Sequence, residues 1–506
     1  MRDKILFWID EDFIHYGISK YLQDNYDCDL FSVVDLLDKP KKFFEKQQLV
    51  KFQKAWYYDE HLPSDNEKPD LAYLKSFEEK YGISLSRMIY LDRMFSLHNK
   101  FYKVKNDQIL SLIERACRFC EDVLDELKPN FFITKMTNMH HNHLFYETCK
   151  ARGIHVLMLV PDKFERRCMI SKESNKFDLN PNSTDISKTR TISELQDFVK
   201  KYSSQKQTKK GITNFQAYTK KKILTWILKF LFSKSENFTD HFNRYGQTKI
   251  RILMNAASNI LQRKIRSSFI DRNFITKIDE TTPFIYYPLH YEPERLYLID
   301  VPHYDNQIYE IKNIAKSLPI GYKLLVKEHP AMVLLNWRDV QYYKQIMDLP
   351  NVQLVHPSIS TDEIIAKCSL VISIAGSAGL ESAFYKKPSI VFSDVIYSTF
   401  PFTYRLKSIE ELSQAIRLSL EREVNLSDLD RYLNILEQNS FEFDIVEIQS
   451  GFNNWFYGGG VLTDVEIAIP KMISFLENYK SSFDKLGFEH VKKIKQYNET
   501  NQKNTL

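Results

Sequence analysis

Apolar and polar positions alternate along the chain in blocks that are typical of a parallel α/β fold. Four short apolar runs, rich in β-branched and aromatic residues, occupy residues 5–9, 31–34, 131–134 and 154–160. A long stretch with helical periodicity lies at residues 107–127, and Pro129 ends it. Buried strands with helices between them have this pattern. It predicts a doubly wound α/β domain over residues 1–200.

Two parts of this first domain have weaker patterns. Residues 43–93 are aromatic and helical in character, and we expect only helices there. A further helix is expected at residues 143–152, which leaves His140 and His141 in the loop before it.

A second series of strand-like runs fills residues 280–440. The runs lie at residues 284–289, 323–327, 352–355, 371–374 and 389–392, and helical segments separate them. Residues 201–279 contain no strand signal, and Lys and Arg there far outnumber Asp and Glu. We therefore predict a basic helical segment, a second α/β domain, and a helical tail at residues 441–506 that crosses back between the domains. The last residues, 498–506, are expected to be disordered.

Two turns of the second domain follow predicted strands directly. They are Lys327-Glu328-His329-Pro330 and Gly376-Ser377-Ala378-Gly379. Open α/β sheets bind ligands beyond the carboxyl ends of their strands, so we predict a nucleotide site here. His329 would donate a hydrogen bond to a phosphate, and Glu381, one turn into the next helix, would accept from ribose hydroxyls. The alternatives are a loop histidine bonded to backbone and a tight turn with glycines for packing.

The block Tyr287-Pro288-Leu289-His290-Tyr291-Glu292-Pro293-Glu294 stands at the end of another strand. Its prolines predict a rigid loop that places His290 and Glu292 over the cleft between the domains. A purely structural elbow is an equally good interpretation.

Together, these three blocks resemble the capsule polysaccharide biosynthesis family, in particular the Kdo transferases of bacterial capsule assembly. The resemblance covers about residues 283–406, and the His329-Pro330 pair is also similar to a motif of bacterial sialyltransferases. It implies a GT-B-like fold of two Rossmann-like domains that face a cleft. It further implies that His329 binds the phosphate of a CMP-sugar, with help from Ser377, Gly376 and Gly379, and that Glu381 contacts ribose.

A transferase also needs groups on the acceptor side. Asp10, Glu11, Asp12 and His15 follow the first strand, where a catalytic base or a sugar-binding turn is expected. Acidic residues are also common at helix N-termini, so this interpretation stays open. The family's acidic motif has no clear match at these positions. His140 and His141 are assigned to the acceptor side of the cleft as well.

Net charge, cysteine content and the lengths of the apolar runs exclude several classes of function. The net charge is +5, and no recognised nucleic-acid module accompanies it. Six scattered cysteines, two of them in a C-x-x-C on an expected core helix, are typical of reduced thiols. The spacing of histidines and carboxylates predicts no metal, and no cofactor is expected. No apolar run approaches the length of a membrane span, so we expect a cytoplasmic protein. Residues 220–234 combine basic and apolar side chains, which suits either a peripheral inner-membrane contact or a packed helix.

The sequence therefore predicts a metal-independent GT-B glycosyltransferase of bacterial surface polysaccharide assembly. Its partners would be a nucleotide-sugar donor, with a CMP-activated acidic sugar such as Kdo as the first choice, and a glycan or glycolipid acceptor. The alternatives are a CDP-polyol phosphotransferase, a UDP-sugar 2-epimerase, or a non-catalytic export or scaffold protein that binds glycan.

Overall fold

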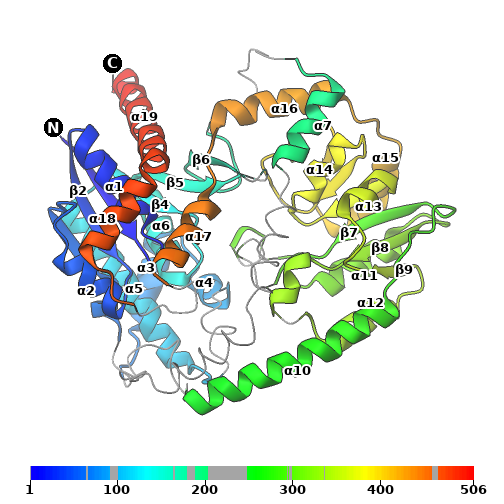
Figure 1. Ribbon diagram of the computed structural model, residues 1–506, viewed down its shortest axis with the longest axis horizontal. Helices are drawn as coiled ribbons and strands as arrows, with labels where there is room; N and C mark the ends of the chain where they lie inside the picture. Colours follow the sequence, from blue (N-terminus) through cyan, green and yellow to red (C-terminus); the bar gives the residue numbers. More distant parts are fainter. Residues whose placement is uncertain are drawn as a thin grey trace.

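The chain folds into two α/β domains, each built on its own sheet (Figure 1). The computed structural model describes residues 2–63, 67–91, 101–162, 164, 166–178, 189–202, 248–292, 295, 299–301, 303–335, 337–457 and 465–505. Residues 220–234, for which a membrane contact or a packed helix was predicted, lie outside this part of the chain.

The first domain has a seven-stranded sheet in the order β13-β6-β5-β4-β1-β2-β3. Its strands are β1 (Asp3–Ile9), β2 (Cys28–Val34), β3 (Lys54–Tyr57), β4 (Phe131–Lys135), β5 (His155–Pro161), β6 (Arg167–Ser171) and β13 (Ser440–Glu442). The five strands from β5 to β3 run parallel, and β6 and β13 add antiparallel pairs at one edge. The central strands are buried on both faces, as their continuous apolar runs predict.

Helices cover both faces of this sheet. They are α1 (Ile14–Asn25), α2 (Asp38–Lys46), η1 (Tyr58–His61), α3 (Leu71–Tyr81), α4 (Leu85–Leu91), α5 (Asn106–Leu127) and α6 (His140–Ala151). The long helix α5 ends at Leu127 and is capped by Lys128, which adopts a left-handed conformation immediately before Pro129.

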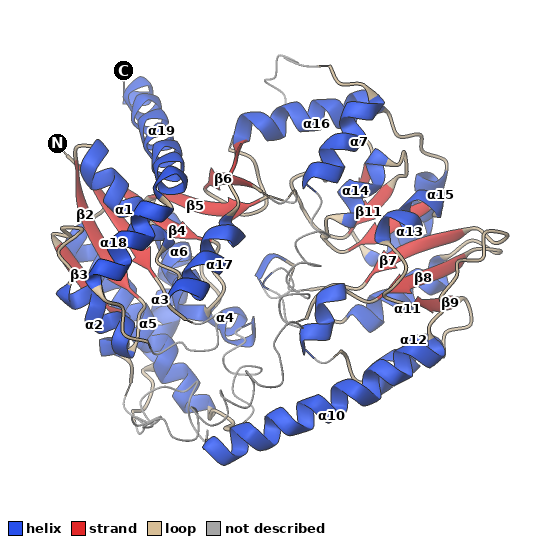
Figure 2. Ribbon diagram, in the orientation of Figure 1, coloured by secondary structure: helices blue, strands red, loops and turns tan. Residues whose placement is uncertain are grey.

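The second domain has six parallel strands in the order β12-β11-β10-β7-β8-β9 (Figure 2). These are β7 (Phe284–Pro288), β8 (Lys323–Lys327), β9 (Val352–Val355), β10 (Leu370–Ser373), β11 (Ser389–Val391) and β12 (Thr403–Arg405). The helices between these strands are α11 (Gln307–Ser317), η6 (Pro330–Leu335), α12 (Val340–Met347), α13 (Thr361–Lys367) and α14 (Ala378–Phe384), and η7 (Ile409–Glu411) and α15 (Leu412–Leu420) follow the last strand. The two predicted turns follow β8 and β10, and β7 lies between these strands in the sheet.

Further helices join the two domains. Helix α7 (Ile192–Tyr202) packs against α14, helix α10 (Lys249–Asn273) runs along one edge of the molecule, and α16 (Leu426–Asn439) leads back to β13 (Figure 1). The tail helices α17 (Ile445–Trp455), α18 (Ile469–Asn478) and α19 (Lys480–Thr505) then lie on the first domain. The predicted return of the tail is therefore confirmed, and so is the arrangement of two α/β domains that face a cleft, as in GT-B folds.

Several sequence-based predictions of individual elements are wrong. Strand β3 lies inside the segment that was expected to be all helix. Helix α6 begins at His140, so the expected loop is its first turn. Helix α19 continues to Thr505, where disorder was expected. The first two errors concern elements whose residues carry no clear period, and the third helix is held by packing on α1.

Candidate functional site

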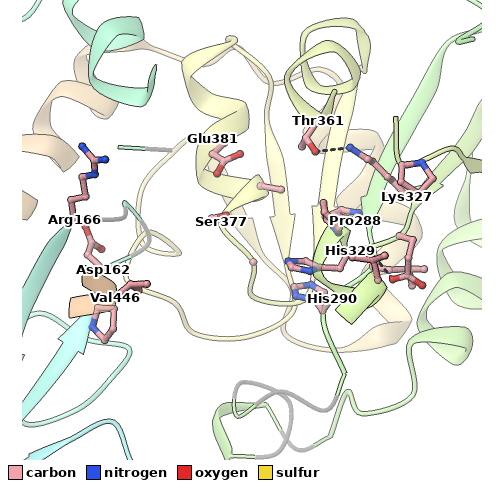
Figure 3. Close-up of a pocket in the computed structure, with 18 of the residues that line it drawn as sticks. Asp162, Arg166, Pro288, His290, Lys327, His329, Thr361, Ser377, Glu381 and Val446 are labelled. Carbon is pink, nitrogen blue, oxygen red and sulfur yellow. Dashed lines mark hydrogen bonds between the residues drawn. The ribbon is translucent and has the colours of Figure 1, made fainter. Parts of the chain in front are cut away.

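A cavity of about 850 Å³ lies between the two domains, at the carboxyl ends of strands from both sheets. Its second-domain wall includes His290, Lys327, His329, Pro330, Thr361, Gly376, Ser377, Ala378 and Glu381. Its first-domain wall includes Lys135, Asp162, Arg166 and Arg167, and the tail adds Asp444, Val446 and Gln449. Figure 3 shows the two groups facing each other across the open space. The structure thus brings most of the predicted nucleotide-binding residues to one wall.

His329 follows strand β8, and its imidazole has a defined orientation. The Ala331 N–H donates to Nδ1 of His329 at 3.2 Å, which leaves Nε2 as the protonated nitrogen of the neutral ring. Burial, together with the charges of Arg338 and Lys327, lowers the pKa of His329 to about 4. His329 is therefore a neutral hydrogen-bond donor at physiological pH.

A buried ion network fixes the loops on which His329 and His290 lie. Arg338 donates from Nε to Glu328 at 2.9 Å, and it also bonds to a Glu292 oxygen and to the His290 carbonyl. The Tyr343 hydroxyl donates to the same Glu328 at 2.7 Å. The side chains of Arg338 and Glu328 are 5% and 0% exposed, and they form an ion pair. A buried charge requires such a partner, so Arg338 neutralises Glu328. Glu292 does not line the cavity; it holds Arg338 in place.

His290 and the turn after β10 pack against one another. The Ser373 hydroxyl lies 3.2 Å from Nε2 of His290, and the Gly376 N–H donates to the same hydroxyl at 2.9 Å. A Cβ on Gly376 would lie 2.8 Å from Cε1 of His290, so this position requires glycine. The Tyr397 hydroxyl bonds to the Gly376 carbonyl from the other side. The turn is thus a rigid part of the wall.

The next residues of the turn differ in their exposure to the cavity. Ser377 and Ala378 line it, whereas Gly379 does not; a Cβ there would meet the Tyr397 hydroxyl at 2.9 Å. Glu381 lies in the first turn of α14, is buried, and still lines the cavity. Lys327 donates to the Ile359 carbonyl at 2.7 Å and to the Thr361 hydroxyl at 2.9 Å, so it also braces the wall.

Asp162 and Arg166 come from the turn between β5 and β6, where no sequence motif marks them as site residues. The Asp162 N–H donates to the Arg167 carbonyl at 3.0 Å, and Arg166 adopts a left-handed conformation with φ 67°. Asp162 is buried, while Arg166 is 59% exposed and lies 3.7 Å from the carboxylate of Asp444. Asp162 and Arg166 thus lie on the side of the cavity opposite the second-domain wall (Figure 3).

Asp10 and Asp12 share one lysine behind this wall. Lys135, at the end of β4, lies 2.7 Å from Asp10 and 2.6 Å from Asp12, and Gln449 of the tail donates to Asp12 at 3.0 Å. Burial and the neighbouring Asp12 charge outweigh Lys135 and raise the pKa of Asp10 to about 8. Burial opposes ionisation of Asp12, but Lys135 and the Gln449 amide hold its pKa below the usual range. Asp10 therefore carries a proton at neutral pH, and Asp12 does not.

The other two residues of the predicted catalytic group differ from these carboxylates. Glu11 is exposed, and its carbonyl accepts from the Tyr457 hydroxyl at 3.2 Å. His15 is buried in α1, and burial lowers its pKa to about 3. None of the four lines the cavity; Lys135 and Gln449, which contact the carboxylates, do.

His140 and His141 face different surroundings. The Nε2 of His141 lies 2.8 Å from Asp35, and its ring stacks on Tyr58. His140 lines a second cavity of about 640 Å³ between α4, α6 and the segment around Arg295. Asn138 lines both this cavity and the main one, so the two adjoin.

Two residues of the main cavity wall have strained backbone conformations. Among the described non-glycine residues with positive φ, Arg166 and Trp337 line this cavity, and Phe13 closes the turn that carries Asp10 and Asp12. Bulky side chains adopt such φ values at an energetic cost that surrounding contacts must offset, and functional sites are where such strain accumulates. Within the described residues, no cluster of histidine, cysteine or carboxylate side chains is arranged to hold a metal ion. The helices of this part of the chain include none that is both long and apolar enough to span a membrane.

Comparisons with known proteins give weak likenesses. No protein-family model matches the chain, and the search of curated proteins gives no match. Among solved structures, the UDP-GlcNAc 2-epimerase of Methanocaldococcus jannaschii is 13% identical, with 87% of this chain and 100% of that chain covered and a TM-score of 0.24. KpsC of Thermosulfurimonas dismutans, a beta Kdo 2,7 transferase, is 11% identical over 72% of this chain and 92% of its own, with a TM-score of 0.31. The UDP-GlcNAc 2-epimerase of Neisseria meningitidis is 11% identical over 87% and 99%, with a TM-score of 0.26. At these values the likenesses do not discriminate between the candidate functions, and the choice depends on the site.

Proposed function

We propose that the chain is a glycosyltransferase that takes a sugar from a nucleotide-activated donor during bacterial capsule or surface polysaccharide biosynthesis. The observation that carries this proposal is the placement of the neutral His329, the Gly376-Ser377 turn and the buried Glu381 on one cavity wall, opposite Asp162 and Arg166. The cavity volume lies within the range of about 300–1,000 Å³ for small-molecule sites.

Each residue on the second-domain wall has a role that its chemistry allows. The His329 Nε2–H would donate to a phosphate oxygen as the bond between the sugar and the phosphate breaks and the electron pair moves to that oxygen. Glu381 would accept from ribose hydroxyls. The network of Arg338 and Glu328 beneath would hold His329 still, which lowers the cost of orienting the ligand.

The first-domain wall would supply the acceptor side. A hydroxyl of the acceptor glycan must lose its proton as it attacks the sugar, and a carboxylate is a suitable base. Asp162 lines the cavity directly, whereas Asp10 lies behind Lys135. Arg166 would pair with an acidic sugar, which favours a Kdo-like donor. The adjoining second cavity, with Tyr146 and His140 in its wall, would extend the acceptor site.

The donor nucleotide decides between this proposal and its alternatives. Measuring the melting temperature of the full chain with CMP, CDP, UMP and UDP tests it directly. At a concentration of about 100 times Kd, a bound nucleotide adds about 2.7 kcal/mol to the free energy of unfolding. A shift with CMP supports the CMP-sugar donor; CDP alone would favour a polyol phosphotransferase, and UDP alone a 2-epimerase or a UDP-sugar transferase. A chain that no cytidine nucleotide stabilises would contradict the CMP-sugar proposal.

A further inference from the structure

Helix α10 presents an exposed stripe of large apolar side chains. Ile250, Met254, Leu261 and Ile265 are 69%, 68%, 61% and 56% exposed. Their spacings of four, seven and four residues place them on one face of the helix, with the exposed Ala257 between them. The stripe runs for about 22 Å along the helix at 1.5 Å per residue. An apolar surface of this length on an exposed helix indicates a binding surface.

The opposite side of the helix is anchored to the second domain at its C-terminal end. Ile270 is buried, and the Phe269 ring stacks on Tyr343. Arg266 donates to the Trp337 carbonyl at 2.9 Å and pairs with Asp339 at 3.3 Å. The rest of the helix continues along the edge of the molecule toward the first domain (Figure 1). The apolar stripe is therefore held on a fixed support.

The charge of the helix identifies the kind of partner. Its sequence contains six lysines and arginines, and the single acidic residue is Asp271 near its end. Arg251, Lys264 and Arg272 are exposed on or beside the apolar stripe. A second copy of the helix would bring cations against cations with no carboxylates to pair them. Nucleic acid would satisfy the charges but offer nothing to the apolar side chains. An anionic lipid surface satisfies both.

We propose that α10 docks on an anionic membrane, with Ile250, Met254, Leu261 and Ile265 inserted among the lipids and the flanking cations on the headgroups. This surface is distinct from residues 220–234 and does not involve the nucleotide. Because α10 is attached to the second domain, docking would hold that domain at the membrane face.

Vesicle sedimentation with the purified full chain tests the proposal. We expect the chain to sediment with vesicles of phosphatidylcholine and phosphatidylglycerol and to remain in solution with phosphatidylcholine alone. The double variant Leu261→Glu/Ile265→Glu should lower the binding about tenfold or more, because it places charge in the inserted face. The matched control is Ala256→Glu/Gln262→Glu, which adds the same charge at exposed positions on other faces of the helix. It should weaken binding much less.

Leu261→Trp provides a direct measure of insertion. Its fluorescence should be quenched by lipids brominated along the acyl chains, in vesicles that contain phosphatidylglycerol. Absence of quenching, or equal losses in the two double variants, would overturn the insertion. Full vesicle binding by Leu261→Glu/Ile265→Glu would show that another segment contacts the membrane. If light scattering gave this variant a lower molecular mass than the wild type, the stripe would instead be an interface between two copies of the chain. Circular dichroism and the nucleotide-induced melting shift confirm that each variant is folded, and failure of nucleotide binding alone leaves this test intact.

Discussion

His329 shows how a single side chain acquires its chemistry from its surroundings. Its ring is neutral because burial and two nearby cations disfavour the charged form, and the Ala331 amide fixes which nitrogen carries the proton. A neutral donor binds a phosphate oxygen without the desolvation cost of a second buried charge. The sequence indicated the residue through its proline neighbour and strand-end position, but it did not indicate the tautomer or the pKa.

His329→Ala should remove the nucleotide-induced melting shift while the unliganded melting temperature changes little. The imidazole is half-buried in the cavity wall, so its loss removes a ligand contact more than a core contact. Isothermal titration should show a loss of affinity of about tenfold or more, since a hydrogen bond to a charged group contributes roughly 1.5–3 kcal/mol. His303→Ala, an exposed histidine of the same domain, is the control. Unchanged affinity in His329→Ala would exclude His329 from the site.

Asp10 gives the residue-scale prediction of pH dependence. Its pKa of about 8 lies above that of an unfolded aspartate, so between these two values the folded chain retains a proton that the unfolded chain releases. The free energy of unfolding therefore falls as pH rises through this window, by up to about 1.4 kcal/mol per pH unit. The Asp10→Asn variant has no proton to lose at this position, so its free energy of unfolding should not show this decrease.

Chemical denaturation at pH 5 and pH 8 measures the effect. The stability of Asp10→Asn relative to the wild type should increase between the two pH values. Asp24→Asn, an exposed residue on α1 that pairs with Lys20, should show no such increase. Parallel pH profiles for Asp10→Asn and the wild type would show that Asp10 is ionised in the folded chain at neutral pH.

Elements with a strong period could be predicted from the sequence, and short edge elements could not. The central strands and α5 lie close to where their apolar patterns placed them, because burial on both faces requires those patterns. Strand β3 has only four residues, none of them fully buried, and β13 has three, so neither carries a readable pattern. Asp162 and Arg166 were missed for a related reason: a turn between antiparallel strands has no motif, and only the fold brings it to the cleft.

Helix α19 illustrates an element whose stability depends on tertiary packing. The Phe483 ring of α19 packs on Gly17 of α1, and the Tyr21 ring of α1 packs on Gly487 of α19. Each helix therefore contributes a glycine that contacts an aromatic ring of the other helix. A Cβ on Gly487 would lie 2.2 Å from Cδ1 of Tyr21. This close approach holds the first half of α19 on α1.

Gly487→Ala should therefore destabilise the first domain although alanine favours helices. Overpacking of this kind costs about 1–3 kcal/mol, more than the gain in helix propensity of about 1 kcal/mol. Urea denaturation measures the change, and Ser481→Ala at an exposed position of the same helix is the control. An increase in stability for Gly487→Ala would mean that α19 does not pack closely on α1.

At the scale of the whole molecule, the main cavity is lined by both domains, and the proposed function gives each wall a different role. The second-domain wall holds the groups suited to phosphate and ribose, and the first-domain wall holds Asp162 and Arg166. The tail is attached to the first-domain wall, because Arg167 donates to Ser440 at 2.9 Å and Gln449 donates to Asp12 at 3.0 Å. Binding and turnover should therefore respond differently to changes on the two walls.

Asp162→Asn tests this division. The amide keeps the shape of the side chain but cannot accept a proton, so nucleotide affinity should stay within about threefold while transfer to a glycan acceptor falls by 10²-fold or more, the scale of general base catalysis. His329→Ala should impair both. Asp125→Asn, on the surface of the first domain, should change neither. Normal transfer by Asp162→Asn would exclude Asp162 as the base and leave Asp12, the ionised member of the Asp10–Asp12 pair, as the carboxylate to examine. Equal losses of affinity in Asp162→Asn and His329→Ala would show that both walls bind the nucleotide.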